Sequence, residues 1–181
     1  MASKTLREEY PMRSSVDRRT VDLSAFPNLV VIYLGMRVRT VRGIRTVSRL
    51  APQIDRAGAD RPEGLLHFEN NIIFKLFPLH IGMRWYWMDF ESMERWARSE
   101  PHRIWWQAFL RDSGGTGFWH ETYFMRGGME AVYDDVDRPL GFHAFAPSSP
   151  ARGPMFSARR RLGLAGEAPV APDGVAEADI Y

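Results

Sequence analysis

The chain has 181 residues, of which 45% are hydrophobic and 13% aromatic, so it can form one sizeable hydrophobic core but not two. It contains no cysteine, which excludes disulfides, thiolate metal sites and thiol nucleophiles. Its 24 Lys and Arg are nearly balanced by 22 Asp and Glu, so the cationic excess of a nucleic-acid-binding protein is missing. The sequence has no long apolar run, and its polar start lacks the apolar segment of a signal peptide. We therefore expect a cytoplasmic protein that binds neither membranes nor nucleic acid.

The two ends of the chain differ in composition from its middle. Residues 1–25 are polar and show no hydrophobic period, while Pro, Gly, Ala and Arg dominate from about residue 147 onward. Such segments are typical of arms and tails. We predict an N-terminal arm over residues 1–25, one domain over residues 26–146, and a Pro/Gly/Arg-rich C-terminal tail over residues 147–181.

The first half of the predicted domain alternates between strand and helix patterns. The continuous apolar run over residues 29–36 predicts a strand that is buried on both faces. From Gly43, apolar residues recur at helical spacing until about residue 56, which predicts an amphipathic helix. Residues 65–76 alternate as a strand does, and residues 81–88 follow after a short connection. This spacing predicts an antiparallel pair.

The second half predicts another helix and two more strands. Asp89 is a plausible N-cap for a helix that bends near Pro101 and ends before Gly114, and strands are expected over residues 117–125 and 130–136. The order is β-α-β-β-α-β with an extra strand, which predicts a ferredoxin-like α+β fold with both helices on one face of the sheet. Because a strand that is apolar on both faces cannot leave one of them in water, we expect a second copy to cover it. The predicted assembly is a homodimer that forms a dimeric α/β barrel.

Several segments carry a family resemblance. They are GFWHETY over residues 117–123, ESMERWAR over residues 91–98, PEGL over residues 62–65 and EAVY over residues 130–133. The chain resembles a monooxygenase-like family of the dimeric α/β-barrel superfamily, together with antibiotic-biosynthesis monooxygenases and, more distantly, haem-dependent aldoxime dehydratases and haem-degrading monooxygenases. The resemblance covers about residues 26–142 and implies an enzyme of monooxygenase type. It leaves the reaction open, since one scaffold serves cofactor-free oxygenases, haem enzymes and simple binders.

His120 and Glu121 are the leading catalytic candidates. They lie mid-strand among aromatic residues, and because successive side chains point to opposite faces, one should face the helices and the other the dimer interior. We expect both to be buried, and a buried imidazole or carboxylate needs a partner and tends to have a shifted pKa. His120 would act as a general base or, if haem is bound, as its axial ligand. Glu121 would orient the substrate, or would instead pair with Arg37 or Arg84 to fix the strand register.

Two further histidines have two interpretations each. His102 follows Pro101 in the second helix, and the resemblance implies a possible iron ligand there because related haem-degrading enzymes use a histidine of this helix. The alternative is a histidine that caps the helix at the solvent edge. His67, beside Glu69 and Asn71, belongs to a second polar cluster or to an edge face. No histidine and carboxylate pattern has the spacing of a zinc site, so haem iron is the only metal considered.

The dense aromatic residues predict an apolar pocket for a small hydrophobic or flat aromatic molecule. Its expected substrate-binding residues are Tyr33, Arg37, Trp85, Trp105, Trp106 and Tyr123. No phosphate loop, nucleophile elbow or dinucleotide fingerprint is found, which argues against ATP, FAD and NAD. An RNA-recognition domain has the same order of elements, but residues 81–88 lack its signature.

Three functions remain at this point. The first is a monooxygenase-type enzyme that needs no cofactor and uses His120 as base. The second is a haem-dependent lyase that resembles aldoxime dehydratase. The third is a non-catalytic protein that binds a hydrophobic ligand.

Overall fold

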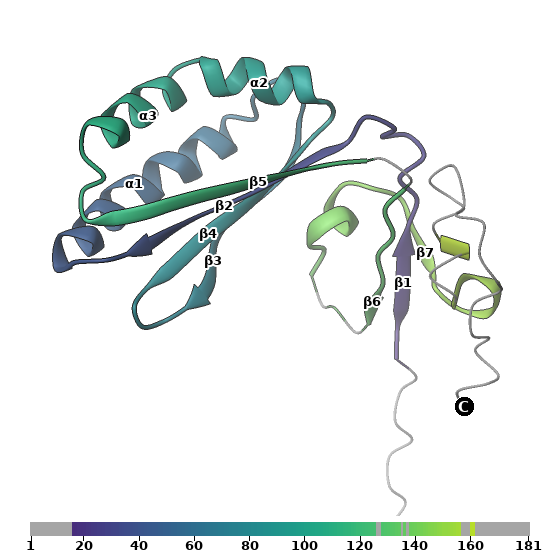
Figure 1. The fold of residues 1–181 in the computed structure, drawn as a ribbon. Helices are drawn as coiled ribbons and strands as arrows, with labels where there is room; N and C mark the ends of the chain where they lie inside the picture. The colour runs from purple at the N-terminus through teal and green to yellow at the C-terminus, as the bar shows by residue number, and fades with distance from the viewer. Residues whose placement is uncertain (1–15, 126–127, 135, 137, 157–159, 162–181) are drawn as a thin grey trace, which may run out of the picture.

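A computed structural model describes residues 16–125, 128–134, 136, 138–156 and 160–161. Within these residues the chain forms a four-stranded antiparallel sheet in the order β3-β4-β2-β5 and a three-stranded sheet in the order β6-β1-β7. The helices lie above the larger sheet and the smaller sheet stands at one of its ends (Figure 1). This arrangement is an α+β fold, as the sequence predicts.

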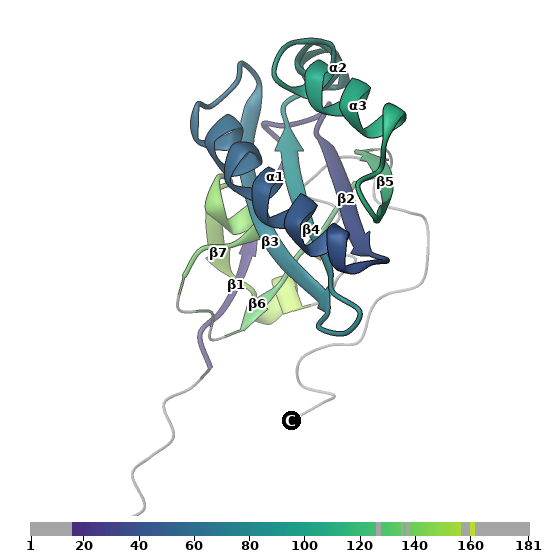
Figure 2. The ribbon, with the colours of Figure 1, turned by 90° about the vertical axis from the view of Figure 1, so that its left-hand side faces the viewer.

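The larger sheet confirms the predicted β-α-β-β-α-β order. Its strands are β2 (Val30–Val38), β3 (Leu65–Lys75), β4 (His80–Trp87) and β5 (Thr116–Phe124). The helices α1 (Val41–Ala59), α2 (Phe90–Arg98) and α3 (His102–Arg111) all cover one face, which we call the helix face (Figure 2). The bend expected at Pro101 is the boundary between α2 and α3. Asp89 is the N-cap of α2, because its carboxylate accepts a hydrogen bond of 2.7 Å from the Ser92 N–H.

The helix face carries a tryptophan-rich core. Trp85 and Trp87 of β4 are 2% and 0% exposed, and both pack against Trp96 of α2 with ring centroids 4.8 and 5.7 Å apart. Val30 of β2 and Met93 of α2 are buried in the same cluster. Alternate strand residues point to this face, and their side chains pack against the helices.

Gly43 fits α1 closely against the turn that precedes β5. A Cβ at this position would lie 2.4 Å from the Gly115 carbonyl oxygen, which is backbone and cannot rotate away. We predict that Gly43→Ala lowers the free energy of unfolding by about 1–2 kcal/mol, although alanine has the better helix propensity. Ser48→Ala on the exposed side of the same helix should instead raise it by a few tenths of a kcal/mol, roughly. Urea denaturation of both variants checks the opposite signs.

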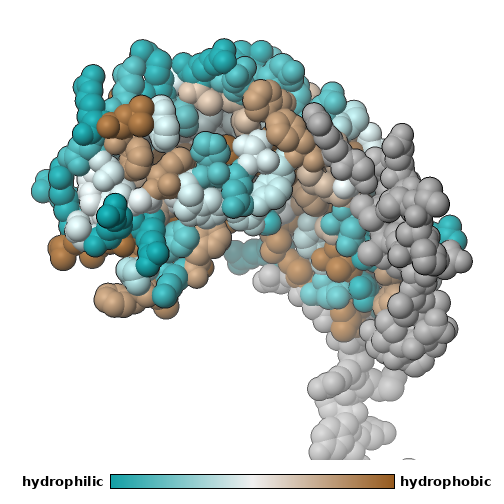
Figure 3. Space-filling view, viewed as in Figure 1, coloured by the Kyte–Doolittle hydropathy of each residue, from teal (hydrophilic) through white to brown (hydrophobic). Residues whose placement is uncertain are grey.

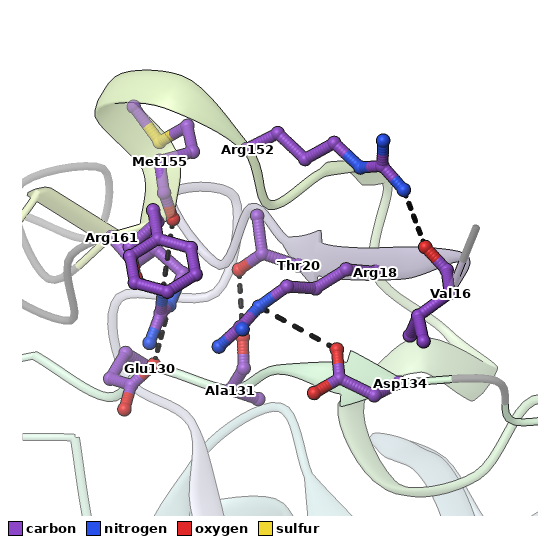
Figure 4. Close-up of polar contacts among 10 residues, drawn as sticks. Val16, Arg18, Thr20, Glu130, Ala131, Asp134, Arg152, Met155 and Arg161 are labelled. Carbon is purple, nitrogen blue, oxygen red and sulfur yellow. Dashed lines mark hydrogen bonds and ion pairs between the residues drawn. The ribbon is translucent and has the colours of Figure 1, made fainter. Parts of the chain in front are cut away.

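The smaller sheet is built from segments that are far apart in the sequence. It contains β1 (Arg18–Val21), β6 (Tyr133–Asp134) and β7 (Ser148–Pro150), and the 3-10 helices η1 (Gly141–Ala144) and η2 (Gly153–Phe156) accompany it. We call β1, β6, β7 and η1 the terminal layer. Thr20 is 0% exposed and its hydroxyl donates to the Ala131 carbonyl at 2.8 Å, while Arg161 donates to Glu130 at 2.7 Å (Figure 4). These polar contacts attach both ends of the described chain to residues 130 and 131.

The terminal layer corrects three expectations. The folded region extends past both expected domain boundaries, since β1 precedes residue 26 and β7 follows residue 146. The strand expected over residues 130–136 is reduced to β6, which pairs with β1 and not with β5. Strands of two to four mostly polar residues have no hydrophobic period, because their pairing with distant segments decides their formation. Most of the expected arm and tail, residues 1–15 and 162–181, lies outside the described residues.

The terminal layer also covers part of the sheet face that lies away from the helices, which we call the open face. Val31 of β2 and Tyr86 of β4 are buried there against Leu23, Tyr133 and Ala146. The terminal layer thus covers part of the β2 face that we expected a second copy of the chain to cover. The remaining open face is hollowed in the space-filling view, with apolar residues at the tip of the β3–β4 hairpin (Figure 3).

Candidate active site

The register of β5 places His120 and Glu121 on opposite faces, as predicted. His120 lies opposite Leu34 on the helix face, and Glu121 lies opposite Tyr33 on the open face. The expectation that both are buried is wrong for the single chain, because β5 is an edge strand and both side chains are exposed. On this chain the two residues do not share a site. The carboxylate of Glu121 accepts a hydrogen bond from the Tyr123 hydroxyl and pairs with neither Arg37 nor Arg84.

His102 and His120 form a histidine pair on the helix face. The ring of His102 packs on Trp96 with centroids 4.9 Å apart, and its Nδ1 lies 2.7 Å from the Ala97 carbonyl oxygen. Since a carbonyl only accepts, Nδ1 carries a proton, and in the neutral ring the lone pair is on Nε2. Burial lowers the pKa of His102, the bond to Ala97 partly opposes this, and the nearby His120 lowers the pKa further. The surroundings of His102 therefore favour its neutral form.

Aromatic rings lie between His120 of β5 and the helix α3. The Phe118 ring lies 6.0 Å from the ring of His120 and 5.6 Å from that of Trp106. Trp106 is 41% exposed, and no residue of α3 is fully buried. The histidine pair thus lies at the edge of the sheet beneath a loosely packed helix.

A narrow pocket lies between α1 and the helix face of the sheet. It is lined by Leu34, Gly35 and Met36 of β2, Ile81, Gly82 and Met83 of β4, Val47, Leu50, Ala51 and Ile54 of α1, and Asn70 and Asn71 of β3. The volume of the pocket that is open to the centre of a water molecule is about 20 Å³. One water needs roughly 10–15 Å³ of such volume, so the pocket has room for about one water molecule. Leu34 is the cross-strand neighbour of His120, so this wall of the pocket lies beside His120.

The six residues expected to bind substrate are divided between the two faces of the sheet. Trp85 is core, Trp105 donates from its indole N–H to Gln53 at 3.1 Å, and both belong to the helix side with Trp106. Strand alternation places Tyr33 and Arg37 on the open face, and Tyr123 contacts Tyr33 there. None of the six lines the pocket beneath α1, so their part in substrate binding stays a prediction.

Asp55, Asn70 and Asn71 form a polar cluster at the β3 end of the pocket that the sequence analysis did not predict. The Asp55 carboxylate accepts hydrogen bonds from the amide nitrogens of Asn70 at 2.6 Å and Asn71 at 3.3 Å. Asn71 has a φ of 60° in a register shift of β3. A bulge of this kind redirects side chains and is common near functional sites. The sequence signal that could have indicated it is the pair of adjacent asparagines within an otherwise alternating strand.

A second polar cluster lies on the open face, as one of the two interpretations of His67 predicts, and is centred on Glu69. Its carboxylate accepts from Arg84 Nε at 2.7 Å and from the Gly141 N–H at 2.6 Å, and His67 Nε2 lies 3.7 Å away. The guanidinium of Arg84 also lies over the ring of Tyr33. Burial alone would raise the pKa of Glu69, but His67, Gly141 and Arg84 lower it to about 2. This Glu69 cluster ties the terminal layer to the sheet.

The comparison with sequence families decides the classification. A family described as monooxygenase af470-like matches residues 29–142, which is more than half of the chain. The chain belongs to this family. The af470-like region contains β2 to β6 and the helices α1 to α3, and therefore both residues of the histidine pair.

The chain is also similar to proteins that are described as aldoxime dehydratases. The chain is 28% identical over 156 residues to an aliphatic aldoxime dehydratase of Rhodococcus erythropolis, which is 72% of this chain and 41% of that protein. A crystal structure of an aldoxime dehydratase with butyraldoxime matches 81% of this chain and 42% of that one, with a TM-score of 0.58 and 26% identity. The chain thus spans about two fifths of these relatives. A cofactor-independent oxygenase from Streptomyces nogalater matches 53% of this chain and 91% of its own, with a TM-score of 0.41 and 11% identity.

In the described part of the chain, no helix is both long and apolar enough to cross a membrane. No group of three or more histidine or carboxylate side chains within the same residues is placed to hold a metal ion.

Proposed function

We propose that the chain is a monooxygenase-type enzyme that oxidises a small hydrophobic compound and uses His120 as its base. The observation that carries this proposal is the position of His120, which is the cross-strand neighbour of Leu34 in the wall of an apolar pocket and lies near a second imidazole, that of His102. The family description supports the reaction class. The expected substrate is hydrophobic and carries a C–H bond that a base can ionise.

The residues at the site meet the minimal requirement of oxidation without a cofactor. His120 removes the proton of a CH₂ group, and the resulting carbanion supplies electrons to O₂. One oxygen atom stays on that carbon as a carbonyl. The other leaves as water, with the second hydrogen of the carbon and the proton that His120 gives back, so the imidazole of His120 is neutral again after each turnover. Burial lowers the pKa of the neighbouring His102, which favours its neutral form and so limits its repulsion of the charge that His120 gains.

The aldoxime dehydratase relatives favour a second candidate, the loss of water from an aldoxime to give a nitrile. His120 would then protonate the departing hydroxyl group. The resemblance also implies haem, and the tautomer of His102 is the one an iron ligand needs. However, the pocket has room for about one water molecule and neither histidine lines it. The residues do not fit a porphyrin there, and we derive no step through haem.

One experiment separates these candidates and the simple binder. Purified full-length protein is incubated under ¹⁸O₂ with 2,4-hexanedione, which has an acidic CH₂ group, and separately with butyraldoxime. Incorporation of one ¹⁸O atom into the diketone supports the proposal, whereas butyronitrile formed without oxygen consumption supports the second candidate. Both compounds recovered unchanged after demonstrated binding would favour a binder. Addition of haemin tests the cofactor, since a Soret band that His102→Ala or His120→Ala removes would contradict the cofactor-free reaction.

We also propose that the chain forms a homodimer through its open face. The rings of Tyr33, Phe74, Trp119 and Tyr123 make an aromatic patch there, with Tyr33 and Tyr123 6.5 Å apart and Phe74 and Trp119 5.6 Å apart. Phe74 and Tyr123 are 41% and 48% exposed. The patch is continuous with the exposed hairpin tip, where Phe77 is 86% exposed. Apolar surface of this kind is typical of an interface, and a second copy offers a matching one.

Tyr123→Glu should convert this dimer to a monomer. The added carboxylate lies in the aromatic patch beside that of Glu121, so a partner would bury two like charges there. Ile104→Glu is the matched control, because Ile104 is 49% exposed on α3 at the other side of the sheet. Light scattering after gel filtration gives the mass of each variant. A wild-type monomer at all concentrations, or equal masses for the two variants, would contradict the interface.

A further inference from the structure

We propose that the pocket beneath α1 binds a slender aliphatic molecule whose polar end donates a hydrogen bond to Asn71. This inference rests on the proposed function, because it names the substrate class of the same site. It adds a binding residue and a ligand shape that the aromatic composition does not suggest.

The walls of the pocket set the shape of the ligand. Eight of its twelve lining residues have aliphatic or thioether side chains, two are glycines and two are asparagines, and none is aromatic. A flat polycyclic ligand would find no ring to stack on. Met36 of β2 and Met83 of β4 are unbranched and flexible, so they can move to admit a chain of methylene groups into a space that now holds about one water.

Hydrogen bonds fix the orientation of the two asparagine amides at the polar end. Asn70 Nδ2 donates to Asp55, and Asn70 Oδ1 accepts from the Trp85 indole N–H at 2.8 Å. A carboxylate only accepts and an indole only donates, so the Asn70 amide cannot be reversed. Asn71 Nδ2 likewise points to Asp55, which leaves its Oδ1 as an acceptor. That oxygen accepts from no donor among the described residues. Because Asn71 is exposed, a ligand donor at this oxygen takes the place of solvent.

The acceptor oxygen of Asn71 selects the polar group of the ligand. A hydroxyl can donate to Oδ1, and an ether of the same size cannot. The carboxylate of Asp55 lies beside it and repels an anionic end, so a fatty acid is a poor fit. The chemistry of this end therefore favours an uncharged donor, and the opposite end of the chain would extend past Leu34 toward His120.

The test uses two C₆H₁₄O isomers and the full-length protein. Isothermal titration calorimetry under argon compares 1-hexanol, which can donate, with butyl ethyl ether, which cannot. Wild-type protein should bind the alcohol about fivefold more tightly, since one hydrogen bond is worth about that factor. Asn71→Gly should abolish the preference. Because φ is 60° at residue 71, glycine suits the backbone and the variant should keep or raise its melting temperature.

A second pair of variants locates the ligand. Ala51→Phe fills the pocket and should weaken binding of the alcohol at least tenfold, whereas Ser48→Phe on the exposed side of α1 should leave it unchanged. Equal affinities for the two isomers in wild-type protein, or a preference that survives Asn71→Gly, would overturn the inference. So would tighter binding of 1-naphthol that displaces the alcohol. His120→Ala should keep the alcohol preference while losing turnover, so failure of the reaction and failure of the binding site are separable.

Discussion

Glu69→Gln should lower the free energy of unfolding by about 2–3 kcal/mol at pH 7, because it leaves Arg84 half-buried without its counter-charge. The side chains of Glu69 and Arg84 are 18% and 26% exposed, and Glu69 also accepts from the Gly141 N–H. The variant therefore loosens the terminal layer as well as the ion pair. Glu94→Gln is the matched control, since its pair with Arg98 is 42% and 75% exposed and should contribute at most about 0.5 kcal/mol. Similar losses for both variants in urea denaturation would contradict this account.

The same residue predicts how stability depends on pH. The pKa of Glu69 is about 2 in the folded chain, below its ordinary 4.5, so the folded state binds fewer protons between these values. The contribution of Glu69 is complete above pH 4.5 and disappears as the pH falls toward 2. The difference between wild-type protein and Glu69→Gln should shrink over that interval. A constant difference from pH 7 to pH 2 would mean that the carboxylate charge is not what the fold uses.

Strong periodic patterns made most of the fold predictable. The run over residues 29–36 and the alternation over residues 65–76 each carry enough apolar residues to specify a strand, and they fall within one or two residues of β2 and β3. The terminal layer was not predictable, because β1 and β7 depend on pairing across more than 100 residues. Its polar strands resemble an arm and a tail until their partner is known.

The candidate site was predictable in its histidines and not in its pocket. Alternation along β5 correctly assigned His120 and Glu121 to opposite faces, but edge position, which exposes both, depends on the strand order of the whole sheet. The sequence placed Asn71 beside His67 and Glu69, whereas its contact with Asp55, which Asn70 shares, depends on a bulge in β3 and on a residue of a different element. Local pattern identifies which face a residue takes, whereas the shape of a pocket depends on how separate elements meet.

His120→Ala should lower the rate of ¹⁸O incorporation into 2,4-hexanedione by at least about 100-fold, because removal of a positioned general base has that effect. Glu121→Ala is a closely matched control: it is the next residue on the same exposed strand, and its side chain points to the opposite face. It should change the rate by less than about threefold. Equal losses of rate in both variants would indicate that the reaction takes place on the open face, where Glu121 lies beside the aromatic patch of the proposed dimer. An unchanged rate in His120→Ala with ligand binding intact would exclude His120 as the base and leave His102, whose Nδ1 faces the Ala97 carbonyl, as the imidazole to test next.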